Sequence, residues 1–195
     1  MFISPEVSSD FVILGRHCHS TVNPGGGQPA FNHPEAPLTD IGIVQARILG
    51  DQLRTDYGIS IADVEVGVSE LYRTRETALR AGCPEDNIHS YSEWNEVAFK
   101  LGQDMDPEEL RMIVNGQLPP PKKVRIAARA AMEAATWEPV IVSSGMVIAG
   151  VCMERKMDMS QFRRPVPECG ELRRVPDWRC RRIGARTIID MSRVA

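Results

Sequence analysis

The sequence predicts an α/β fold, a three-layer sandwich in which helices cover both faces of a mostly parallel sheet. Two short apolar runs, at residues 11–14 and 139–143, each end in glycine or small polar residues and are typical of fully buried strands. Segments with helical signals follow both runs, so that strands and helices alternate along the chain. That alternation is the order of a parallel sheet with helical crossovers.

The composition predicts one globular domain spanning residues 1–195, placed in the cytoplasm. Hydrophobic residues make up 43% and charged residues 25%, and the net charge of −3 argues against nucleic acid or an anionic membrane as a partner. The five cysteines are odd in number and form no Cys-x-x-Cys pair, which favours a reducing compartment. Residues 1–10 lack the basic start of a signal peptide, and no apolar stretch is long enough to span a bilayer.

The first strand leads into a long loop rich in glycine and proline at residues 21–37, and loops of that length are often functional. A helix is predicted to follow, with Thr39 as its N-cap, Asp40 in its positive first turn and an end near Arg54. The apolar stripe that we expect to face the core consists of Ile41, Val44, Ile48, Leu49 and Leu53.

The rest of the chain continues the alternation. Apolar or alternating runs predict the strands, and glycine, proline and asparagine end the helices. The predicted elements are a strand at residues 64–69, a helix at 71–80, a strand at 87–92, a helical turn within 94–102, a short helix at 107–115, a helix at 122–136, a strand at 139–143, a helix at 145–157, a strand at 170–175 and a last strand at 186–189.

Arginines are concentrated in the C-terminal part of the chain, against the sign of the net charge. We interpret them as a solvated basic face, with binding of an anionic partner as the alternative. They are Arg163, Arg164, Arg173, Arg174, Arg179, Arg181, Arg182, Arg186 and Arg193.

The candidate functional residues gather around Arg16 and His17, directly after the first strand. Ligands bind at the carboxyl ends of the strands in open α/β sheets, and an arginine beside a histidine there indicates anion recognition. A first interpretation is a metal site built on His17 and His19. It needs further ligands, and only His33 and His89 remain, both in turn-like segments.

A second interpretation is a cysteine nucleophile. Cysteine phosphatases need an arginine six residues after the cysteine, but Pro24 follows Cys18 at that distance and Val175 follows Cys169. Cys18 remains a candidate for a redox-reactive thiol, because its two basic neighbours favour the thiolate.

The third interpretation is a histidine nucleophile that attacks phosphorus. A phosphoryl group in transfer carries charge on three oxygens, so it requires several fixed cations and hydrogen-bond donors around it. An acid must also protonate the leaving oxygen. The chain has candidates for each of these roles.

Five segments resemble motifs of the histidine phosphatase superfamily, in the same order. Residues 12–23 are similar to its opening Arg-His-Gly motif, and residues 37–46 to its Pro-Leu-Thr-x-x-Gly-x-x-Gln-Ala helix start. Residues 69–78 resemble its Ser-Pro-Leu-x-Arg-Ala-x-Gln-Thr-Ala segment, residues 94–96 its Leu-x-Glu, and residues 140–148 its Val-x-Val-x-His-Gly-x-x-Ile. The resemblance covers most of the chain and implies the phosphoglycerate-mutase-like fold.

The resemblance also implies roles for single residues. His17 would be the phosphorylated nucleophile, and Arg16 and Arg73 would clamp the phosphate. Asn23 would donate to the phosphate and Glu96 would be the proton donor, with no metal or organic cofactor. The plainer alternatives are a structural histidine at His17, a helix-surface arginine at Arg73 and a solvated carboxylate at Glu96.

Two positions depart from the family pattern. Cys18 stands where the family has a glycine next to the nucleophile and the bound substrate. Ser144 stands where it has its second catalytic histidine. A serine can donate one hydrogen bond to the substrate but brings no charge, which weakens stabilisation of the transition state. His19 is the neighbour that could compensate.

The function predicted from the sequence is hydrolysis of a phosphomonoester, on a small molecule or a protein, through phospho-His17. A mutase is less expected, because residues 96–121 are few for an elaborate lid. The alternative is a catalytically degenerate member, natural or engineered, that binds phosphorylated ligands or a protein partner without turnover. Substrate choice would depend on the loops at residues 21–37 and 97–121, which carry no readable code.

Overall fold

The computed structural model describes residues 11–23, 33–95, 112–113, 117–118, 121–135, 137–161 and 167–176. Its strands are β1 (Phe11–Arg16), β2 (Val66–Ser69), β3 (Ile88–Tyr91), β4 (Val140–Ser143) and β5 (Leu172–Pro176). Its α-helices are α1 (Asp40–Tyr57), α2 (Tyr72–Arg80), α5 (Lys122–Ala134) and α6 (Gly145–Glu154). Short 3-10 turns lie at Ile61–Asp63, Glu85–Asn87, Ser92–Trp94 and Met159–Gln161.

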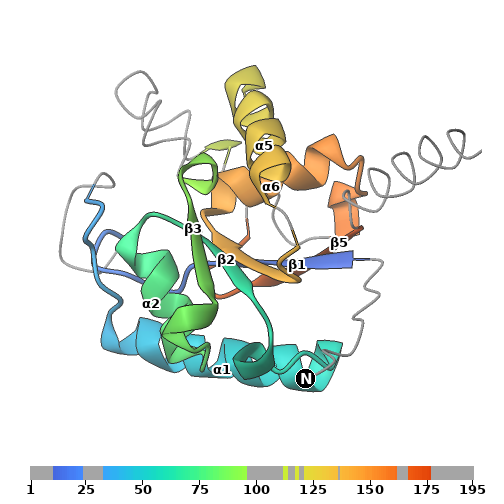
Figure 1. Cartoon of the computed structure of the whole chain (residues 1–195). Coiled ribbons are helices and arrows are strands. Elements are labelled where there is room, and N and C mark those ends of the chain that lie inside the picture. The colour runs from blue at the N-terminus through green and yellow to red at the C-terminus, as the bar shows by residue number, and fades with distance from the viewer. Residues whose placement is uncertain are drawn as a thin grey trace, which may run out of the picture.

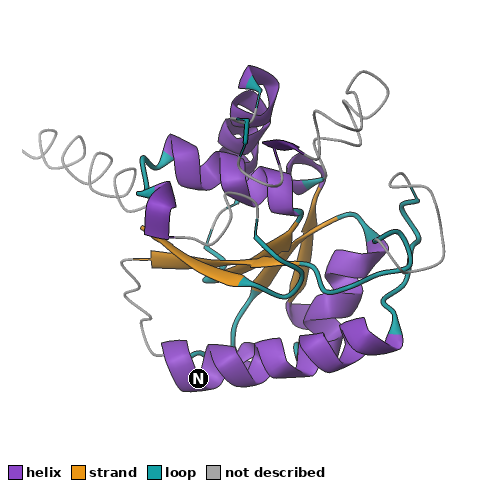
Figure 2. Ribbon diagram, turned by 180° about the vertical axis from the view of Figure 1, so that it is seen from behind, coloured by secondary structure: helices purple, strands orange, loops and turns teal. Residues whose placement is uncertain are grey.

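The described strands form one sheet in the order β3-β2-β4-β1-β5, in which β5 runs antiparallel to β1 and the other pairs are parallel. Helices α1 and α2 lie on one face and α5 and α6 on the other (Figure 1). Figure 2 shows the same three layers from behind. The predicted α/β sandwich with a mostly parallel sheet is confirmed. The carboxyl ends of β1, β4 and β2 therefore meet at one edge of the sheet.

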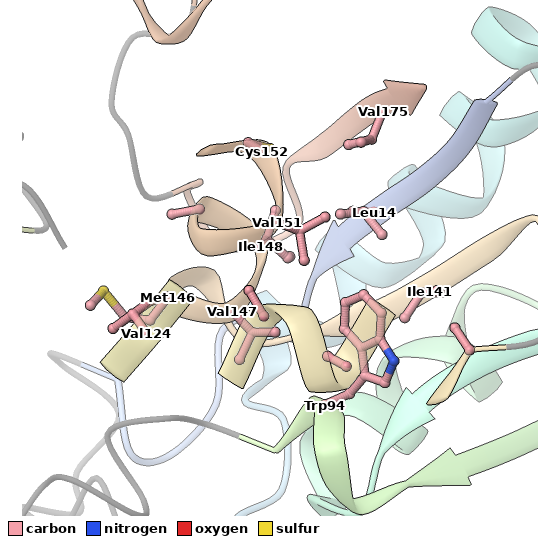
Figure 3. Close-up of a cluster of buried hydrophobic side chains, with 14 of the residues drawn as sticks. Leu14, Trp94, Val124, Ile141, Met146, Val147, Ile148, Val151, Cys152 and Val175 are labelled. Atoms are coloured by element: carbon pink, nitrogen blue, oxygen red, sulfur yellow. The ribbon is translucent and has the colours of Figure 1, made fainter. Parts of the chain in front are cut away.

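Strand β1 is buried on both faces, which is why its sequence is apolar without alternation. Val12 and Leu14 belong to the core cluster under α5 and α6, together with Trp94 and Ile141 (Figure 3). Ile13 points the other way, into the cluster under α1. Full burial of one such side chain contributes about 1.5–3 kcal/mol, and a shift by one residue would exchange the two faces. The register that places the end of β1 is thus strongly determined.

Helix α1 begins where the sequence predicts and ends one turn later. The hydroxyl of Thr39 accepts the N–H of Gly42 at 3.2 Å, as an N-cap does. The helix continues past Arg54 to Tyr57, and Gly58 ends it in the left-handed region with a φ of 68°.

The predicted apolar stripe of α1 is wrong in three of its five members. Ile41, Val44 and Ile48 are 64%, 54% and 50% exposed, and the buried face consists of Gly42, Ala46, Leu49 and Leu53. The reason is a close approach: a Cβ on Gly42 would lie 1.9 Å from the carbonyl oxygen of His19. Small residues, rather than the most hydrophobic ones, let α1 pack against the loop after β1.

Other boundaries shift by a few residues, and part of the predicted C-terminal structure lies outside the described residues. Helix α6 ends at Glu154 rather than residue 157, and β5 covers Leu172–Pro176. Of the predicted helix at residues 107–115, Met112 and Ile113 are described and helical, while the predicted strand at 186–189 is not described.

The predicted basic face is partly corrected. Of the nine arginines assigned to it, Arg173 and Arg174 lie within the described residues. Arg173 is 1% exposed and forms an ion pair with Glu171 at 3.0 Å, so it belongs to the interior. Arg174 lies over the ring of Phe11 at 3.8 Å.

Within the described part of the chain, none of the helices combines the length and the hydropathy needed to cross a membrane.

Candidate active site

His17 directly follows β1 and is 2% exposed. Its backbone N–H donates to the carbonyl oxygen of Ser143 at 3.0 Å, so the end of β4 as well as the end of β1 positions it. Its Nδ1 lies 2.9 Å from the carbonyl oxygen of Cys18. A carbonyl can only accept, so Nδ1 carries the hydrogen and Nε2 carries the lone pair.

The imidazole of His17 is uncharged at neutral pH. Burial is the main cause that holds the pKa of His17 well below 6.5, and the positive charges of Arg16 and Arg73 lower this pKa further. His19 also contributes to the lowering. A neutral ring with a fixed tautomer offers Nε2 as a nucleophile or base.

Helix α2 brings a buried arginine against that nitrogen. Arg73 is 2% exposed, and its Nε donates to Nε2 of His17 at 3.3 Å. Its Nη1 donates to the carbonyl oxygen of His33 at 3.3 Å. The buried residues of α2 are mostly polar, which is unusual for a helix that packs on a sheet. The structure therefore places Arg73 beside His17, and its role as a phosphate clamp stays a prediction.

Arg16 is held by the turn before β5. Its backbone N–H donates to the carbonyl oxygen of Glu171 at 3.0 Å, and its own carbonyl oxygen accepts the N–H of Gly170 at 3.2 Å. The Nη1 of its guanidinium donates to the carbonyl oxygen of Pro167 at 2.7 Å, while its buried Nε has no hydrogen-bond partner among the residues that the structure describes. The Nη1 donor of Arg16 therefore holds the side chain in place, and its Nε donor remains unsatisfied.

Ser144 lies between β4 and α6, next to the residue that binds the backbone of His17. It is fully buried, and within the described part of the chain its Oγ has no hydrogen-bond partner, not even as a cap of α6. The N-terminus of a helix carries unsatisfied N–H groups and a partial positive charge. Ser144 and the first turn of α6 thus present donors beside His17, which is an arrangement suited to an anion.

Two further predicted residues lie in the loop after His17. Asn23 is 8% exposed, and its Oδ1 accepts both the N–H and the hydroxyl of Ser20 at 2.8 Å. Its oxygen is therefore used inside the loop, and its amide nitrogen is the group that can face a ligand. His19 is turned toward the start of α1, where its Nδ1 lies 2.9 Å from the hydroxyl of Thr39.

Cys18 faces away from this pocket. Its side chain packs in the core cluster with Ile13, Leu38 and Leu49, and its N–H donates to the hydroxyl of Thr77 at 3.0 Å. Burial raises the pKa of Cys18 to about 12. The interpretation of Cys18 as a reactive thiol is therefore wrong, because burial outweighs its basic neighbours.

The structure adds two supporting residues that sequence reasoning missed, both on α2. The hydroxyl of Thr77 accepts the Cys18 N–H and donates to the carbonyl oxygen of Arg73 at 2.7 Å, so it joins the loop to the helix. Glu76 accepts the N–H of Leu38 at 2.7 Å and fixes the approach to α1. The sequence signal that could have identified them is a short helix without an apolar stripe, in which polar residues recur at i, i+3 and i+4 from Arg73.

Glu96 lies outside the described residues. Asn95, the residue before it, accepts the N–H of Glu70 at 2.8 Å and donates to the carboxylate of Glu70 at 2.9 Å, at the carboxyl end of β2.

Of the histidines weighed as metal ligands, His89 contacts Glu65 instead. In the described part of the chain, no three His, Cys, Asp or Glu side chains are placed to hold a metal ion.

The model of the histidine phosphatase superfamily (branch 1) matches residues 12–121, more than half of the chain. The chain belongs to this superfamily. The matched residues include Arg16, His17 and Arg73 and end before Ser144.

Solved structures share the fold of this superfamily member. A phosphoglycerate mutase from Thermus thermophilus is 22% identical, with 86% of this chain and 93% of that chain covered and a TM-score of 0.56. A phosphoserine phosphatase from Entamoeba histolytica, solved in complex with 3-phosphoglyceric acid, is 17% identical, with 84% and 89% covered and a TM-score of 0.55. At these identities the similarity shows the fold, and the phosphoglycerate-mutase-like prediction is confirmed. No curated protein sequence matches the chain.

Proposed function

We propose that this chain is a phosphomonoester hydrolase that works through a phosphohistidine at His17. The observation that carries the proposal is the buried, neutral imidazole whose Nε2 lone pair lies 3.3 Å from Nε of Arg73. Such a nitrogen can attack phosphorus while the guanidinium moves its hydrogen bond to a phosphoryl oxygen. Membership of the histidine phosphatase superfamily supports this assignment. We also propose a cytoplasmic location, which rests on the cysteine pattern.

The pocket supplies donors for the phosphoryl oxygens. Arg73 provides a buried positive charge, and the unsatisfied Nε of Arg16 provides a second cationic donor. The hydroxyl of Ser144 and the N–H groups of the first turn of α6 supply neutral donors on the β4 side. The amide nitrogen of Asn23 is the fifth candidate. Charge-assisted hydrogen bonds to phosphate are the strong ones in this set.

The proposed reaction has two steps. In the first, a bond forms between Nε2 of His17 and phosphorus while the ester P–O bond breaks, and Glu96 gives a proton to the leaving oxygen. In the second, water attacks phosphorus and gives a proton to the Glu96 carboxylate, the N–P bond breaks to restore neutral His17, and inorganic phosphate leaves. Glu96 enters through its sequence motif. The substrate is a small-molecule or protein phosphomonoester.

The second candidate function is binding of phosphorylated ligands without turnover. It is favoured by Ser144, which brings no positive charge to the phosphoryl group. Removal of a single preorganised donor from such a site costs about 3–4 kcal/mol in the transition state. The anion would still bind, because Arg16 and Arg73 remain.

Single-turnover kinetics separate the two functions. The native chain, Ser144→His and His17→Ala are each mixed in excess over p-nitrophenyl phosphate, and nitrophenolate release and phosphohistidine are followed, the latter by intact mass after alkaline quench. We expect the native chain to gain one phosphoryl group and His17→Ala to gain none. Reaction of Ser144→His alone would assign the native chain to ligand binding, and failure of both would exclude the nucleophile.

The role of Glu96 has its own test. Nitrophenolate leaves without protonation, whereas an alkoxide needs an acid. We therefore expect Glu96→Gln to slow phosphorylation by an alkyl phosphate such as glycerol 2-phosphate about 100-fold or more and to change the reaction of p-nitrophenyl phosphate little. Glu93→Gln, three residues earlier, is the matched control. Equal loss with both substrates would contradict a proton donor.

A further inference from the structure

Helix α1 presents a continuous apolar face to solvent. Ile41, Val44 and Ile48 recur at i, i+3 and i+7 and are 64%, 54% and 50% exposed. Residues at this spacing lie on one side of a helix. Single exposed apolar side chains are ordinary, whereas three along one face mark an interaction surface. We call these three residues the α1 face.

The α1 face forms a ridge between two grooves. One groove, of about 410 Å³, lies between α1 and the turn before β5 and is lined on the helix side by Gln45, Ile48, Gln52, Asp56 and Tyr57. The other, of about 320 Å³, lies on the opposite flank and is lined on the helix side by Arg47, Gly50, Asp51 and Arg54. A helix ridge with a groove on each side is the shape that another helix packs against, ridge into groove.

We propose that the α1 face binds the α1 face of a second copy of this chain, with the two helices antiparallel about a two-fold axis beside Val44. Ile41 lies three residues before Val44 and Ile48 four residues after it, so the axis brings Ile41 against the partner subunit's Ile48. An isologous contact requires a surface that is complementary to itself.

Two of the charges beside the α1 face, Asp40 and Arg47, have the same symmetry, while Asp51 on that flank pairs with Arg54 of its own helix at 2.6 Å. Asp40 and Arg47 are both exposed and stand two turns apart on one flank of the helix. In the antiparallel arrangement this flank meets the same flank of the other copy with its direction reversed. Asp40 therefore lies opposite the partner subunit's Arg47, and Arg47 opposite the partner subunit's Asp40. This self-complementary order favours a second copy over an unrelated protein.

The expected association is weak and reversible. Stable interfaces bury roughly 800 Å² on each partner, and three half-exposed aliphatic side chains provide only part of that area. Exposed ion pairs add little affinity, but they determine the orientation.

Sedimentation velocity of the full chain tests the contact, from about 10 µM to about 1 mM, a range that spans weak dissociation constants. We expect the wild type to shift from monomer toward dimer, and Val44→Glu to remain monomeric. Ile126→Glu is the matched control, since Ile126 is 57% exposed on α5, on the other face of the sheet, and should associate as the wild type does. Thermal unfolding verifies that both variants fold.

The charge order gives a second, independent test. Arg47→Asp or Asp40→Arg alone should weaken association at least several-fold at low salt, and the double exchange should restore it. A wild type that stays monomeric to 1 mM would overturn the proposal, as would equal loss in Val44→Glu and Ile126→Glu or a double exchange without recovery. A monomeric wild type that Val44→Glu destabilises far more than Ile126→Glu would instead indicate that the chain's own residues cover this face.

Discussion

Thr77 is the residue whose removal most directly tests how the nucleophile loop is held. Its hydroxyl is fully buried, accepts the N–H of Cys18 at 3.0 Å and donates to the carbonyl oxygen of Arg73 at 2.7 Å. Thr77→Val keeps the side-chain shape and removes the hydroxyl. The Cys18 N–H is then buried without a partner, which costs about 1–3 kcal/mol. We expect a loss of unfolding free energy of that size.

Urea unfolding measures this loss, and calorimetry gives the matching fall in melting temperature. One kcal/mol corresponds to about 2–4 °C in a chain of this size, so the expected fall is about 2–12 °C. Thr55→Val is the control, because Thr55 is exposed on α1 and its hydroxyl donates to the neighbouring Asp56. Its effect should stay within about 0.5 kcal/mol. Equal stability of the two variants would refute the role assigned to Thr77.

The same variant should also bind phosphate more weakly. Thr77 holds the backbone next to His17 and the carbonyl oxygen of Arg73, so its loss loosens both groups that meet the ligand. Titration calorimetry with inorganic phosphate compares Thr77→Val with Thr55→Val at a temperature where both are folded. Unchanged affinity despite lower stability would show that the hydroxyl supports the fold alone.

Further predictions concern charge, packing and accessibility. The pKa of His17 is lowered on folding, so as the pH falls the unfolded chain takes up a proton on this residue before the folded chain does. The free energy of unfolding should therefore decrease as the pH falls from about 6.5 through the folded pKa. Urea unfolding at several pH values should show a weaker pH dependence of this free energy in His17→Gln, and an identical pH dependence in both chains would contradict the shift. Gly42→Ala puts a methyl group 1.9 Å from the carbonyl oxygen of His19. Urea unfolding should therefore show a net loss of unfolding free energy, although alanine stabilises a helix interior by about 1 kcal/mol relative to glycine. Cys18, with its thiol buried and a pKa of about 12, should react with iodoacetamide at pH 8 only after unfolding, which peptide mass mapping detects; labelling of the folded chain would oppose this.

The layers of the fold were readable from the sequence because burial leaves a direct pattern. Strands β1 and β4 are covered on both faces and show uninterrupted apolar runs. The face of α1 was not readable in the same way. Hydrophobicity favours Ile41 over Gly42, but the contact that decides the face is with the carbonyl oxygen of His19, a residue outside the helix. A steric limit set by another element leaves little trace in the periodicity of the helix itself.

For the candidate site, too, residue types and spacing were predictable from the sequence, whereas properties set by contacts with other parts of the chain were not. Arg16, His17 and Arg73 were predicted because their motifs state residue types and spacing, and the structure brings them together. The tautomer of His17 could not be predicted, because it depends on a carbonyl oxygen 2.9 Å away. The pKa of Cys18 was predicted in the wrong direction, since sequence neighbours show charge but not burial.

The unsatisfied donors connect the structure of the pocket with its chemistry. The Oγ of Ser144 and the Nε of Arg16 are buried and have no partner in the described ranges of the chain, and a buried donor without a partner costs about 1–3 kcal/mol. A fold retains such a cost at a site where a ligand satisfies the donors. A tetrahedral oxyanion beside His17 would provide acceptors for both groups and charge for the guanidinium. Anion binding therefore follows from either proposed function, and the positive charge absent at Ser144 bears most directly on turnover. That is why Ser144→His, compared by single-turnover kinetics rather than by affinity, separates a phosphatase from a binding protein.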